Sequence, residues 1–96
     1  SLNKPSLAEQ ILVQAVEQDK NGQAALFFAK FLLEQRRFSE AAQLAEKAVE
    51  QSNEIEAYLV HIVALQRSGK PHLALDVWTR ARQLAPNDPR LADIQF

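Results

Sequence analysis

The chain of 96 residues contains no cysteine and only two glycines. Without cysteine, neither a disulfide framework nor a thiolate metal site can form. The lack of cysteine fits both the cytoplasm and a bacterial periplasm, so it leaves the localisation open. Gly22 and Gly69 stand far apart, which excludes a glycine-rich loop that cradles phosphate. We therefore expect neither a cofactor nor a metal site in this chain.

Long hydrophobic runs and an excess of positive charge are also absent. The longest apolar run covers residues 24–29, whereas a transmembrane helix needs ~20 residues. A net charge of −1 gives none of the basic character that nucleic-acid binding requires. We expect no membrane insertion by this segment and no nucleic-acid partner. Because the chain lacks methionine and opens on Ser1, we expect it to be a segment of a longer protein.

An internal repeat organises the residues that are present. Apolar and small residues recur with a spacing of 33 positions in three helical patterns. Several columns share this spacing, which indicates a repeat protein built from similar units. The columns are Ala8, Ala41 and Ala74; Ala15, Ala48 and Ala81; Leu12, Ala45 and Trp78 between them; and Pro5, Phe38 and Pro71, three positions before the first column.

Helical periodicity runs through each copy of the repeat. Leu7, Ile11 and Ala15 recur every four residues, which places them on one face of a helix. The connections between the patterns are only ~2–5 residues long, so consecutive helices must be antiparallel neighbours. No stretch shows sustained strand alternation. The expected helices are five, covering residues 6–18, 23–35, 39–51, 54–67 and 71–84.

The second full unit, residues 55–88, carries the clearest motif. A helix pair of this length resembles the tetratricopeptide repeat, whose first helix has large core residues and whose second has small ones before a closing proline. The unit 22–54 fits less well, because it has Asn53 where the family has proline and is one residue shorter. The matching positions of the second unit are Tyr58, Ile62 and Leu65, Gly69 in the turn, then Ala74, Trp78, Ala81 and Pro86.

The resemblance implies an all-α fold, a right-handed α-solenoid of antiparallel helix pairs with about two and a half units in a single domain. Residues 5–21 would be the second helix of a partial repeat, followed by the repeats 22–54 and 55–88 and by a tail, 89–96. We expect the tail to fold back over the last helix. The solvating helix that usually closes such arrays is missing, so further repeats or a second copy would cover that end.

The resemblance also implies a function, a scaffold for protein–protein interaction that binds a partner helix or peptide. First helices of this family line a concave groove, and here that groove would be apolar. A clamp for a terminal carboxylate is not expected, because only two basic residues and no asparagine stand at these positions. Alternatively, neighbouring helices of the same array could cover this apolar groove, which would then not be open to a partner. The expected partner-binding residues are Leu26, Phe27, Lys30, Leu33, Leu59, Val60, Val63 and Arg67.

Two other functions stay open at this point. The segment could be a self-associating structural spacer, a homodimer that pairs through the groove or the uncapped ends. It could also be a positioning domain within a larger multi-domain protein of a bacterial-type assembly or secretion machine. Catalysis is not expected, because the sequence has no nucleophile elbow and no recognisable set of catalytic groups.

Four further sites carry individual expectations. His61 either responds to pH or ligand, or lies at a helix interface with its ring nitrogens satisfied locally, and we expect the second. His72 and Asp76 should form a local ion pair rather than part of a metal site. Trp78 is expected in the core, although it could anchor a partner. The pair Arg36-Arg37 should be a solvated helix end beside the helix dipole.

Overall fold

A computed structural model describes residues 6–96, and in this range the chain forms six helices and no strand. Pro5, which belongs to the repeat pattern, lies outside the described residues. No helix in the described range is long and apolar enough to cross a membrane. The helices are α1 (Leu7–Gln18), α2 (Gln23–Glu34), α3 (Phe38–Ser52), α4 (Ile55–Arg67), α5 (Pro71–Leu84) and α6 (Pro89–Ala92).

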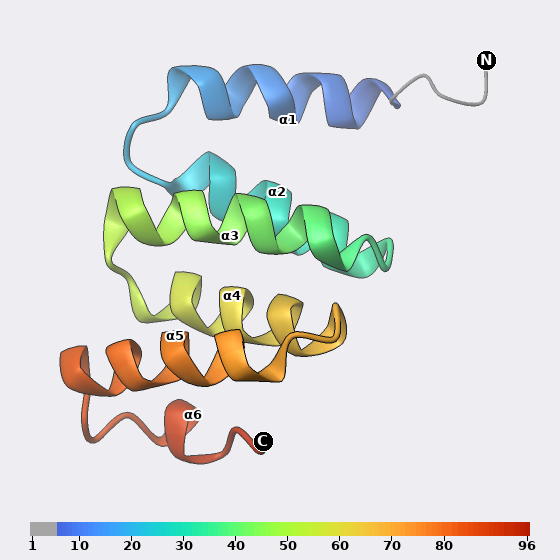
Figure 1. Ribbon diagram of the computed structural model, residues 1–96. Helices are drawn as coiled ribbons and strands as arrows, with labels where there is room; N and C mark the ends of the chain where they lie inside the picture. The colour runs from blue at the N-terminus through green and yellow to red at the C-terminus, as the bar shows by residue number, and fades with distance from the viewer. Residues whose placement is uncertain (1–5) are drawn as a thin grey trace.

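The five long helices follow one another along the molecule (Figure 1). Their connections alternate between its two sides, and α3 and α5 lie in front of α2 and α4 in this view. Each long helix packs against its neighbours in the chain, and α2 also contacts α4. The molecule is elongated, with dimensions of 45 × 27 × 17 Å.

The alanine columns form the seam between the helices. Small side chains let helix backbones approach closely, and larger apolar residues such as Leu32 and Ile62 fill the remaining space. On α1, by contrast, Ala8 is exposed and Ala15 only half-buried, because α1 has a single long-helix neighbour. The column members that are fully buried are Ala41, Ala45, Ala48, Ala74 and Ala81.

Glycine is required at the connection between α1 and α2. Gly22 has a φ of 83°, in the left-handed region that L-residues with a side chain rarely adopt. A Cβ at this position would lie 3.0 Å from the Ala48 carbonyl oxygen and 3.1 Å from the Ser52 Cβ. Gly22 therefore lets α1 and α2 connect directly over the end of α3.

Gly22→Ala should destabilise the chain more than Gly69→Ala, which is its matched control. Gly69 has a φ of 81° but nothing near its missing Cβ, so alanine there costs about 1–2 kcal/mol for the left-handed backbone alone. At Gly22 the overlap with a backbone oxygen adds a further ~1–3 kcal/mol. Urea unfolding of both variants measures the difference, and equal losses would contradict the close approach at Gly22.

The tail folds back over the last long helix, as expected. The indole N–H of Trp78 donates to the carbonyl oxygen of Leu91, with 2.8 Å between nitrogen and oxygen. The Phe96 ring lies edge-on to the indole, with 5.6 Å between the ring centres. Trp78 is therefore half-buried beneath the tail. The tail also contains the sixth helix, which the sequence prediction missed, and the Asp88 side chain caps it by accepting from the Arg90 N–H at 2.9 Å.

Two expectations about charged residues were wrong. Arg36 is exposed just after the end of α2, as expected, but Arg37 is not a solvated helix end. Arg37 bridges Glu9 of α1 and Glu40 of α3, with Nη2 3.0 Å from Glu9 Oε2. This guanidinium lowers the pKa of the Glu9 carboxyl below its usual value. His72 and Asp76, both within the described range, form no ion pair, and both side chains are exposed.

Candidate functional site

The expected binding residues lie on α2 and α4, which contact each other side by side. Polar contacts also join these helices: Lys30 forms an ion pair with Glu56, and Gln23 Nε2 donates to Glu54 Oε1 at 3.0 Å. Between and beside them lies a surface that we call the α2–α4 face. It comprises Phe27, Lys30, Leu33, Glu34, Glu56, Leu59, Val63 and Arg67.

An open cavity of about 260 Å³ marks one end of this face. Its apolar lining comes from Leu33 and Val63, and Glu34 and Arg67 supply opposite charges at its edge. The guanidinium carbon of Arg67 lies 5.8 Å from the centre of the Phe38 ring, which also lines the cavity. A cation–π contact at an exposed site contributes ~0.5–1 kcal/mol, so it favours this position of the guanidinium at the cavity.

Phe27 is the most exposed apolar side chain of the α2–α4 face, with 64% of its surface accessible. It stands seven residues, about two turns, before Glu34 on the same side of α2. Leu33, Leu59 and Val63 are half-buried, and Leu33 and Leu59 pack against the core from this face. The face thus combines the apolar side chains Phe27, Leu33, Leu59 and Val63 with the charged groups Lys30, Glu34, Glu56 and Arg67.

Two of the expected binding residues are not on the surface. Leu26 and Val60 are only 5% and 9% exposed, so the structure places them in the core and not on the α2–α4 face. Because α2 packs against both α3 and α4, a residue that faces either neighbour becomes part of the core. For these two residues the structure agrees with the alternative that neighbouring helices of the array cover them.

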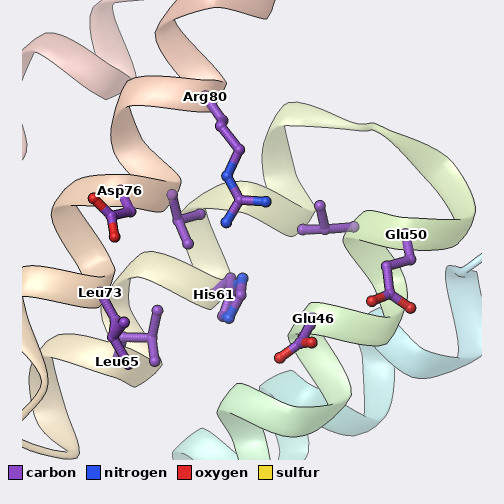
Figure 2. A pocket seen from close by; sticks show the side chains of 9 residues that line it. Glu46, Glu50, His61, Leu65, Leu73, Asp76 and Arg80 are labelled. Carbon is purple, nitrogen blue, oxygen red and sulfur yellow. The ribbon is translucent and has the colours of Figure 1, made fainter.

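A second cavity, of about 230 Å³, lies between α3 and α5 with α4 as its floor (Figure 2). The sequence alone drew attention to His61, Asp76 and Leu65 among its lining residues, but did not predict that they share a cavity. A usable signal was present, because two charged pairs stand one helical turn apart, Glu46 with Glu50 and Asp76 with Arg80. The apolar members of the lining are Val49, Leu65, Leu73 and Val77.

His61 is the one buried polar residue in the described core. Only 6% of it is exposed, and its Nδ1 has no hydrogen-bond partner. Burial lowers the pKa of His61 to about 4, and the positive charge of Arg80 acts in the same direction against a smaller opposite effect of Glu50. The expected helix-interface position is therefore confirmed, but the expected local satisfaction of the ring nitrogens is wrong.

The described residues contain no group of three or more His, Asp or Glu side chains that could hold a metal ion. The two cavities differ in their linings. The cavity at Leu33 and Val63 offers mainly apolar contacts, and the cavity between α3 and α5 offers charged groups. Comparison with protein-family models, curated proteins and solved structures gave no match for this chain.

Proposed function

We propose that this chain is a tetratricopeptide-type scaffold whose α2–α4 face binds a helix or an extended peptide of another protein. The observation that carries the proposal is an exposed Phe27 on α2, two turns before Glu34, which lines the cavity with Leu33, Val63 and Arg67. An apolar side chain left open beside a preformed hollow is typical of an interaction surface.

Three features support the architecture on which this proposal rests, a right-handed α-solenoid of antiparallel helix pairs. Connections alternate between the two sides of the molecule (Figure 1). The corresponding helices α2 and α4 of successive units touch. The alanines that recur every 33 residues are fully buried in both full units. Together these features are the expected consequence of stacking similar units.

The size and chemistry of the face fit a short segment of a partner. A helix of 12 residues such as α2 is about 18 Å long, so the face accommodates about three turns of a partner helix. Burial of Phe27 would contribute ~1.5–3 kcal/mol, the usual range for a large apolar side chain. The charges of Lys30, Glu34, Glu56 and Arg67 would set the orientation of the partner more than its affinity.

Phe27→Ala should weaken peptide binding by about tenfold or more, as expected for an aromatic anchor. The measurement uses peptides selected against this chain from a random library, with fluorescence anisotropy giving Kd. Because Phe27 is largely exposed, the variant should keep the helical circular dichroism of the parent chain.

Leu84→Ala is the matched control for Phe27→Ala. Leu84 is a large apolar residue that is 52% exposed on α5, away from the α2–α4 face. Its replacement should leave Kd unchanged. Selected peptides that bind the Phe27→Ala chain as tightly as the parent chain would show that the α2–α4 face is not the binding surface.

Self-association is a second candidate, favoured by the outer side of α1. Leu7 and Ile11, one turn apart, are both exposed there, and α1 packs against only one other long helix. If this side pairs with a second copy, sedimentation velocity should show a dimer at tens of micromolar, and Ile11→Ser should convert it to a monomer. A monomeric parent chain would remove this candidate and leave the peptide-binding proposal intact.

A further inference from the structure

The cavity between α3 and α5 lies on the far side of α4 from the α2–α4 face. His61 and Leu65 line the cavity, whereas Leu59 and Val63 belong to the α2–α4 face. Members of the two sets stand two residues apart, which corresponds to a rotation of about 200° around the helix. The cavity is therefore a separate site, and its role goes beyond the proposed peptide binding.

Four charged side chains line this cavity without any partner. Glu46 and Glu50 come from α3, and Asp76 and Arg80 come from α5 (Figure 2). Within the described residues none of the four takes part in a side-chain hydrogen bond or an ion pair. All four side chains are exposed, so their charged groups are open to solvent and to a ligand.

The floor of the cavity adds an independent sign of a missing partner. His61 extends from α4 into the space between α3 and α5 (Figure 2). It is 6% exposed, and its Nδ1 is without a hydrogen bond. A buried polar group normally has a partner, and its absence calls for an explanation. A neutral imidazole has one ring nitrogen that can accept a hydrogen bond.

The balance of charge selects the kind of ligand. Three carboxylates against one guanidinium leave the lining with an excess of negative charge, which favours a cation and repels a phosphate or carboxylate. The described residues offer no group of three or more metal ligands. A volume of about 230 Å³ is below the ~300–1,000 Å³ of pockets for drug-sized ligands, so the cation must be small.

We propose that the cavity formed by Glu46, Glu50, His61, Asp76 and Arg80 binds a single ammonium or guanidinium group. Carboxylates of α3 and α5 accept its N–H donors, and the imidazole of His61 accepts one more. The apolar residues Leu65, Leu73 and Val77 surround the methylene chain that carries the cation. The same chemistry could come from a lysine or arginine side chain of a protein or from a free amine.

The test titrates the chain with Nα-acetyl-arginine methylamide and, separately, with a Gly-Ser peptide that contains one arginine. The chain has only two histidines, so NMR of the imidazole signals follows His61 directly, with the exposed His72 as internal reference. We expect a saturable shift of the His61 signals, with little change at His72. If both probes bind, the ligand is a lysine or arginine side chain of a protein. If only Nα-acetyl-arginine methylamide binds, the ligand is a free small cation.

The double variant Glu46→Gln with Glu50→Gln should weaken probe binding by about tenfold or more, because it removes charge-assisted hydrogen bonds. Asp76→Asn on α5 provides a second, independent variant with an effect in the same direction. Glu17→Gln, an exposed glutamate on α1, is the matched control and should change nothing.

Two results would overturn the cation site. One is the absence of a saturable His61 shift with either probe, and the other is equal affinity in the parent chain and the Glu46→Gln, Glu50→Gln variant. The Phe27→Ala chain should bind the cation normally. The failure of this inference and the failure of the peptide-binding proposal therefore give different results.

Discussion

Replacing Ile62 with alanine should lower the free energy of unfolding by about 2–5 kcal/mol, the cost of emptying a packed core position. Ile62 has no exposed surface and stands in the middle of α4, which contacts α2, α3 and α5. Neighbouring helices cannot close the resulting space easily, because their spacing is set by the buried alanines of the seam. Urea unfolding followed by circular dichroism measures the loss.

Ile11→Ala is the control that makes this result specific. It removes the same atoms from a long helix, but Ile11 is 57% exposed on α1. The change in its free energy of unfolding should stay within about 0.5 kcal/mol, as for ordinary surface substitutions. If Ile62→Ala and Ile11→Ala had equal effects, α4 would not be the central helix of a packed array.

Acidification should destabilise the chain through His61. Its pKa is about 4 in the folded chain against 6.5 for an ordinary histidine. Above pH 6.5 neither the folded nor the unfolded state binds the proton. As pH falls from 6.5 toward 4, the unfolded state binds the proton while the folded state does not, so the free energy of unfolding decreases. The loss is complete below the folded pKa and amounts to roughly 3 kcal/mol at most.

The His61→Gln variant isolates this contribution. Its side chain does not titrate in this range, whereas the carboxylates that also titrate are common to both chains. The free energy of unfolding of the parent chain, minus that of the variant, should decrease between pH 6.5 and pH 4. A difference that stays constant over this range would contradict the burial of a neutral imidazole at position 61.

The helices were predictable because their signals are local. Gly22 and Gly69 mark helix ends, Pro71 starts α5, and the structure places these boundaries within a few residues of the predicted ones. The seam was predictable because alanine columns with a constant spacing have one simple physical meaning, close contact between helices. The missed helix α6 had signals too, an aspartate cap followed by Pro89 in the first turn, but residues 89–96 were predicted only as a tail.

The surface was harder to predict, because exposure depends on how each helix is rotated against its neighbours. Leu26 and Phe27 are adjacent and equally apolar, yet Leu26 faces the core and Phe27 faces outward. The charged cavity was missed for a related reason. Glu46 and Arg80 are far apart in sequence and share a site only once α3 and α5 lie on either side of His61.

A structure of the chain bound to a library-selected peptide tests the central proposal most directly. We predict that the peptide lies along α2 and α4, covers Phe27 and inserts a side chain between Leu33 and Val63. The peptide would then bury the apolar side chains of this face and leave the α3–α5 cavity open. A peptide bound to the outer side of α1, or between α3 and α5, would contradict the assignment of the α2–α4 face as the interaction surface.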